Sequence, residues 1–200
     1  MKTAFNKGRR VALAAAAMLL AASSSWAQWE LDNSRSELNF VSIKNASVAE
    51  THRFGSLVGF ITEAGKVQVN INLDSVDTQI DIRNERMREY LFQTVDFPTA
   101  AVTASVDPEV LNSAARGGTL TTDVAVQLSL HGLQQTLSVP VVVVGAADGG
   151  LRVVTARPVT VRASDFALDG GIARLQELAG LASISTAVPV TLNLVFVRAD

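Results

Sequence analysis

The stretch KVQVNINLD, residues 66–74, decides the fold class because its polar and apolar side chains alternate without a break. Successive side chains of a β-strand point to opposite faces, so an extended chain would gather the apolar ones on one side. That apolar side comprises Val67, Val69, Ile71 and Leu73. The stretch therefore predicts a strand with one buried face and one solvated face.

The same period of two returns along the chain. Clear alternation covers residues 119–130, 136–144 and 188–197, and weaker strand patterns cover residues 37–43, 53–62, 99–106 and 151–163. Several of these segments are separated by short groups rich in glycine, as at residues 63–65, 116–118, 131–132 and 148–150. About eight strands with short turns favour an all-β antiparallel meander, closed as a barrel or stacked as a sandwich.

Two segments depart from this rhythm and predict helices. In residues 171–182 the apolar side chains have helical spacing, and Gly180 is suited to end the helix. In DIRNERMREYLF, residues 81–92, three acidic and three basic side chains cancel, which argues against a phosphate-binding stripe. Its apolar side chains are Ile82, Met87, Tyr90, Leu91 and Phe92. We expect this segment to be an amphipathic helix that caps one end of the sheet structure.

The N-terminus has the layout of a secretory signal peptide. Four basic residues precede an apolar run over residues 11–22, and Ser25-Trp26-Ala27 offers small residues for cleavage after Ala27. The apolar run is too short to span a membrane, which takes about 20 residues. We therefore expect a signal peptide over residues 1–27, one domain over residues 28–200, and a periplasmic location. Arg9-Arg10 leaves the twin-arginine export route open beside the general one.

Composition excludes several classes of protein. Loss of the four basic residues of the leader takes the net charge from −2 to −6, so the domain has no general attraction for nucleic acid. The chain has no cysteine, which rules out disulfides and thiolate metal sites.

Catalytic and metal-binding patterns are weak. His52 and His131 are the two histidines, and the sequence predicts surface or turn positions for both. Residues 74–85 resemble a calcium loop at a few acidic positions, but Gln79 occupies the position where the sharp turn needs glycine. We therefore expect no enzyme activity, no metal and no cofactor.

Several blocks, taken in order, resemble the YceI-like family of exported, lipocalin-like proteins. They are WELDNSRSELNFVSIK at residues 29–44, the block of residues 54–106 with SVDT, IRNERMREYLF and FP, LSLHGLQQTLSVPVVVV at 128–144, ASDFAL at 163–168 and VPVTLNLVF at 188–196. The resemblance implies an eight-stranded antiparallel up-and-down barrel with a helix at its mouth. It also implies a hydrophobic cavity for an isoprenoid-type lipid, such as a polyprenyl phosphate or a quinone, without stable membrane insertion, and it leaves a homodimer open.

On this interpretation the inward side chains would form the lipid-binding lining. The candidates are Phe40, Phe54, Phe60, Val69, Ile71, Met87, Leu91, Phe92, Val124, Val126 and Leu128. The same apolar residues would also suit an ordinary packed core. The alternative function is therefore a ligand-free envelope module that acts through protein contacts, with its many alanines filling the barrel.

Overall fold

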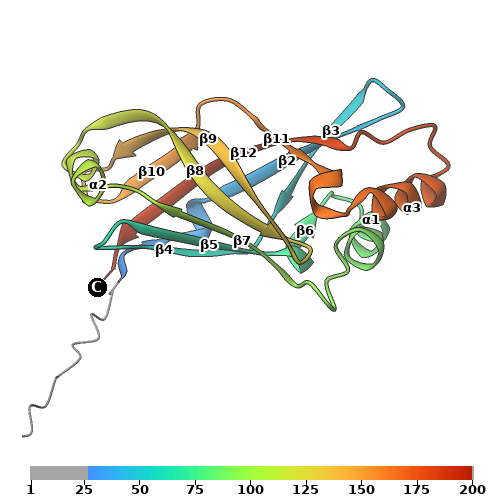
Figure 1. Cartoon of the computed structure of the whole chain (residues 1–200), viewed down its shortest axis with the longest axis horizontal. Helices are drawn as coiled ribbons and strands as arrows, with labels where there is room; N and C mark the ends of the chain where they lie inside the picture. The colour runs from blue at the N-terminus through green and yellow to red at the C-terminus, as the bar shows by residue number, and fades with distance from the viewer. Residues whose placement is uncertain (1–26, 200) are drawn as a thin grey trace, which may run out of the picture.

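The computed structural model describes residues 27–199, which form an elongated β-barrel with helices at both ends (Figure 1). All pairings between its strands are antiparallel. The strands are β1 (Ala27–Leu31), β2 (Glu37–Lys44), β3 (Val48–Phe54), β4 (Leu57–Thr62), β5 (Lys66–Asn72), β6 (Val76–Asp77), β7 (Thr99–Ser105), β8 (Thr119–Leu130), β9 (Leu133–Gly145), β10 (Leu151–Thr155), β11 (Val159–Arg162) and β12 (Ala187–Arg198). The expected signal peptide lies outside the described residues, apart from Ala27.

These segments combine into eight long strands. β10 and β11 lie end to end along β12, and β1 and β2 lie end to end along its other edge. β3 and β4 continue one another in the same way, as do β5 and β6. Pairing of β1 with both β4 and β12 closes the sheet. The predicted eight-stranded antiparallel barrel is therefore confirmed, and the sandwich is excluded.

Residues 66–72 of the alternating stretch form β5, between β4 and β7, and its last two residues, Leu73 and Asp74, begin η2. Val67 pairs with Ile61 and Ala104, and Ile71 pairs with Leu57 and Ala100. Its four alternating apolar side chains all face the barrel interior, as predicted. Closure removes the exposed sheet edges, so the polar face of this strand meets solvent while the apolar face meets the other strands.

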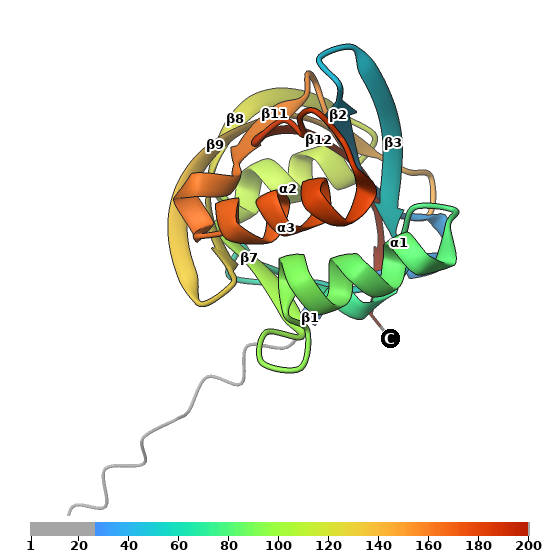
Figure 2. The ribbon, with the colours of Figure 1, turned by 90° about the vertical axis from the view of Figure 1, so that its right-hand side faces the viewer.

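Helical segments close the two ends of the barrel. The helices are α1 (Asp81–Arg86), α2 (Pro108–Ala115) and α3 (Asp169–Ala179), with η1 (Asn33–Arg35), η2 (Leu73–Ser75), η3 (Met87–Phe92) and η4 (Ala163–Phe166) as short turns. α1 and α3 lie together at one end, and α2 lies at the other (Figures 1 and 2). Gly180 ends α3 in the left-handed conformation, as predicted.

α2 was not predicted from the sequence, so the expectation of one capping helix is incomplete. The local signals were present: the Asp107 side chain accepts a hydrogen bond from the Glu109 amide, and Pro108 takes the first helical position. The helix packs tightly, because a Cβ added at Gly145 would lie 1.9 Å from the carbonyl oxygen of Ala114. A bare glycine on β9 thus lets α2 seal this end of the barrel.

Candidate functional site

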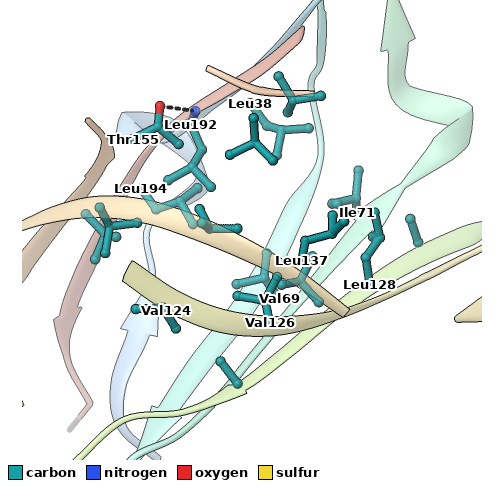
Figure 3. A pocket seen from close by; sticks show the side chains of 18 of the residues that line it. Leu38, Val69, Ile71, Val124, Val126, Leu128, Leu137, Thr155, Leu192 and Leu194 are labelled. Atoms are coloured by element: carbon teal, nitrogen blue, oxygen red, sulfur yellow. Dashed lines mark hydrogen bonds between the residues drawn. The ribbon is translucent and has the colours of Figure 1, made fainter. Parts of the chain in front are cut away.

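The barrel encloses an apolar cavity of about 280 Å³. Side chains from the eight strands, from α2 and α3 and from η3 line it, and several of the lining side chains point into one interior space in Figure 3. Among the described residues, Thr122 and Thr155 are the polar members of this lining. The Thr155 hydroxyl already accepts a hydrogen bond from the Leu192 amide, at 3.3 Å. The cavity therefore suits a ligand without hydrogen-bonding groups along its length.

Ten of the eleven predicted lining residues border this cavity. They are Phe40, Phe54, Val69, Ile71, Met87, Leu91, Phe92, Val124, Val126 and Leu128. They come from β2, β3, β5, β8 and η3, so chain closure brings together residues that are far apart in sequence. Their role in binding a ligand stays a prediction.

The prediction for Phe60 is wrong in orientation, since this residue is not part of the lining. Residues 57–61 form a continuous apolar run, in which alternation cannot show which side faces inward. Pairing with β5 sets the register and turns Leu57 and Ile61 inward, both 2% exposed. Phe60 consequently shares the outer face with Val58, which is 65% exposed.

The segment predicted to cap the barrel does so, with a change of helix type at its midpoint. α1 continues directly into η3, a π-helical turn, and Met87, Leu91 and Phe92 are buried there. In an α-helix, Phe92 would be rotated by about 140° from Met87, five residues earlier. A π-helix bonds residues five apart and therefore returns Phe92 to the same face. Ile82 does not share this face and is 52% exposed, contrary to the prediction.

α3 packs beside η3 at the same end of the barrel (Figure 2) and completes what we call the lid, residues 81–92 together with residues 169–179. Gly171 touches η3 so closely that an added Cβ would lie 2.6 Å from the Tyr90 carbonyl oxygen. The Arg174 guanidinium lies 5.5 Å from the centre of the Tyr90 ring. Ile172 of α3 reaches past this contact and lines the cavity. Both parts of the lid therefore contribute to the cavity wall, residues 81–92 through η3 and residues 169–179 through α3.

A polar cluster adjoins the lid. Glu50 on β3 receives Lys44 at 2.9 Å and Arg83 of α1 at 2.7 Å. The hydrogen bond from Lys44, together with the positive charge of Arg83, lowers the pKa of the Glu50 carboxyl. His52 lies two residues further along β3 and shares a hydrogen bond of 2.9 Å with the Ser42 hydroxyl.

The position of His52 corrects the sequence prediction, which placed it at the surface or in a turn. His52 lies within β3 and is 4% exposed. Its neighbours in sequence are polar, and the local pattern does not reveal that this part of β3 contacts α1 through the Glu50–Arg83 pair. His131 does lie in a turn, with a positive φ beside Gly132, and its ring packs 4.4 Å from the Phe97 ring.

Burial of His52 predicts a dependence of stability on pH. Burial lowers the pKa of the imidazole below its ordinary value of about 6.5, and the charge of Arg83 lowers this pKa further. Below about pH 6.5 the unfolded chain then binds more protons than the folded protein, so stability is lost as the pH falls. Urea denaturation across this range should show a flatter pH profile for His52→Gln than for the wild type. If the two profiles run parallel, the pH dependence does not come from His52, because His131 is present in both proteins and His52 only in the wild type.

Residues 27–199 contain neither a candidate metal site nor a candidate membrane-spanning helix. No group of three or more His, Cys, Asp or Glu side chains in this range could hold a metal ion. None of the helices in this range combines the length and the hydropathy that crossing a membrane requires.

Solved structures of several other proteins share the fold of this chain. A polyisoprenoid binding domain from Saccharophagus degradans, implicated in plant cell wall breakdown, is 40% identical, with a TM-score of 0.84 over 87% of this chain and 100% of that domain. BcnA of Burkholderia cenocepacia shares the fold at 19% identity and a TM-score of 0.66, over 82% of this chain and 98% of BcnA. The YCEI protein of Campylobacter jejuni also shares the fold, at 17% identity and a TM-score of 0.51. The match covers 79% of this chain and 90% of the Campylobacter protein.

No curated protein sequence matches the chain. The model of the YceI-like domain, in contrast, matches residues 29–196, nearly the whole described barrel. This match agrees with the closed eight-stranded architecture and with the 40% identity to the Saccharophagus domain. The chain belongs to the YceI-like family.

Proposed function

We propose that this protein is a non-catalytic binding protein that holds an isoprenoid-type lipid, a polyprenyl phosphate or a quinone, in its barrel. The continuous apolar cavity is the observation that carries the proposal. The polyisoprenoid binding domain from Saccharophagus degradans, which matches this chain over its full length, supports the ligand class.

The physical chemistry of the cavity agrees with a slender hydrocarbon chain. Its volume of about 280 Å³ lies near the lower end of small-molecule sites, which span roughly 300–1,000 Å³. An isoprenoid chain has no polar groups to satisfy, so its binding would come from burial of apolar surface, at about 25 cal/mol per Å². The ten cavity-lining residues named above are the proposed contacts.

The alternative, a ligand-free module that acts through protein contacts, was supported by the many alanines that could fill the barrel. Ala100, Ala104 and Ala114 do line the interior, yet the cavity remains beside them. A well-packed interior leaves few voids larger than a water molecule. The cavity therefore favours the binding protein over the packed module.

We also propose that the protein acts in the periplasm after removal of residues 1–27. The charged start, the apolar run and the small residues before Gln28 support export. The matched family domain begins at Trp29, two residues after the expected cleavage site.

The direct test is extraction of the purified, exported protein with organic solvent, followed by mass spectrometry. We expect a prenyl-chain lipid in the extract, in an amount close to one lipid molecule per protein molecule. If the extract holds no such lipid and the protein takes up no added prenyl chain, the proposed function is wrong.

A cavity-filling substitution tests the same proposal by a second route. Val126→Phe places a larger side chain inside the cavity, whereas Val58→Phe places it on the exposed outer face. We expect Val126→Phe to weaken binding of geranylgeraniol about tenfold or more, and Val58→Phe to leave it unchanged.

Thermal unfolding of the same variants separates a cavity from a packed core. Insertion of extra volume into a filled core costs about 1–3 kcal/mol, whereas a cavity accepts the ring. A marked loss of stability in Val126→Phe with unchanged binding would argue for the packed interior.

A further inference from the structure

The two ends of the barrel, with α2 at one and the lid at the other, are closed in different ways (Figure 1). At the α2 end the closure uses backbone groups. Before the helix, the Val106 amide donates to the Gly65 carbonyl oxygen at 2.9 Å. After the helix, the Gly118 carbonyl oxygen accepts from the Gly145 amide at 3.0 Å. Backbone hydrogen bonds therefore hold the chain on both sides of α2 against the barrel.

Glycines bring the backbone of this region into direct contact with the barrel. A Cβ added at Gly65 would collide with the Val106 carbonyl oxygen. One added at Gly145 would collide with the Ala114 carbonyl oxygen of α2. Because backbone meets backbone at both points, no side chain lies between α2 and the wall that could change its conformation and let the helix shift.

The lid, in contrast, is tied to neighbouring segments by long side chains. Arg83 of α1 reaches the Glu50 carboxylate at 2.7 Å, and Arg88 of η3 donates to the Asp74 carbonyl oxygen at 3.2 Å. Side chains of this kind change rotamer on a timescale of nanoseconds or less where they are exposed. Of the two ends, the α2 end is therefore the one that we expect to keep its position when the cavity is filled.

The α2 end presents an apolar surface to the cavity, which we call the floor. It consists of Val106, Val110, Leu111 and Ala114. Leu111 and Ala114 are buried, so the floor separates the cavity from solvent. A hydrocarbon chain inside the barrel can contact the floor but has no path past it.

A fixed floor makes the binding of a hydrocarbon chain depend on its length. Each methylene group that leaves water for an apolar lining strengthens binding about fourfold. The part of a chain that finds no room between the lid and the floor stays in water and adds nothing. The cavity is small, about 280 Å³, so a long prenyl chain reaches this limit.

We propose that the floor is a length stop, which selects among prenyl lipids the chains short enough to lie between it and the lid. This proposal rests on the proposed function and adds the property of the chain that the protein selects. The selection depends on side chains of α2 and is independent of the polar end of the lipid.

The test offers the purified protein, freed of bound lipid, an equimolar mixture of prenyl alcohols in mild detergent. The mixture contains geraniol, farnesol, geranylgeraniol, solanesol and undecaprenol, in order of increasing length. Extraction and mass spectrometry of the bound fraction give the relative affinity for each length. We expect binding to strengthen about tenfold or more for each added prenyl unit that fits, and to level off within the series.

Two substitutions move the floor in opposite directions. Leu111→Ala lowers it, and Ala114→Leu raises it, since both residues line the cavity. We expect the preferred length to increase in the first variant and to decrease in the second, by up to about one prenyl unit, because leucine and alanine differ by three carbon atoms. Ser113→Leu, on the exposed side of the same helix, is the control and should select lengths as the wild type does.

Ile172→Ala separates a stop at α2 from a simple gain in volume, because Ile172 lines the cavity from the lid. We expect it to leave the preferred length unchanged. Equal shifts in Ile172→Ala and Leu111→Ala would mean that volume alone counts, which excludes a stop at α2.

Other results also overturn the stop. It is excluded if affinity keeps rising through undecaprenol, or if a floor variant that folds, as judged by circular dichroism, keeps the wild-type preference. Either floor variant decides this alone, should the other fail to fold. In these cases the chains still bind and the proposed function stands. If the wild type binds none of the chains, the proposed function fails together with the stop.

Discussion

Replacement of Leu91 by aspartate is expected to lower the free energy of unfolding by about 3 kcal/mol or more and to abolish uptake of a prenyl chain. Leu91 is 9% exposed, lines the cavity and packs in the lid where α3 meets η3. A carboxylate at this position would lose its hydration without gaining a cation inside the apolar lining. Urea denaturation measures the stability, and fluorescence titration with geranylgeraniol measures the uptake.

Ile82→Asp is the matched control, because it makes a similar change in the same helical segment at a side chain that is 52% exposed. We expect its unfolding curve and its lipid titration to stay close to those of the wild type. If Leu91→Asp is as stable as this control and still binds the chain, residues 81–92 do not cap the cavity.

Two adjacent glycines at the start of α3 should respond to alanine with opposite signs. A Cβ at Gly171 would lie 2.6 Å from the Tyr90 carbonyl oxygen and 2.8 Å from the Leu91 Cα, so the two parts of the lid must separate. A Cβ at Gly170 meets nothing within 4 Å. We expect Gly171→Ala to destabilise the protein by about 1–3 kcal/mol, and Gly170→Ala to stabilise it by up to about 1 kcal/mol, since alanine is the better helix former.

Differential scanning calorimetry of both glycine variants checks this pair of signs. Faster exchange of the amide hydrogens of η3 in Gly171→Ala would localise its effect to the lid. Equal and favourable shifts for both variants would mean that α3 does not rest on η3 at this distance.

Strict alternation explains why much of the site was predictable from residues alone. Val69 and Ile71 on β5, and Val124, Val126 and Leu128 on β8, can face the interior together in only one register of an alternating strand. Phe60 was mispredicted because residues 57–61 are all apolar, so alternation does not show which of them face inward. Only the pairing of β4 with β5 decides that Gly59 faces inward and Phe60 outward. The helix α2 was not predicted, although Asp107 and Pro108 mark its start.

The sequence by itself determined the class of the protein: alternating strands joined by short turns, an amphipathic segment at residues 81–92, and an apolar interior. These properties are local, since they depend on side chains within a few residues of one another. Only the tertiary structure decided that the interior keeps a cavity and that Gly171 and Gly145 admit the helices at its two ends. It also decided that His52 is buried beside Arg83. Each of these features depends on contacts between segments far apart in the chain, so it is set by closure of the barrel.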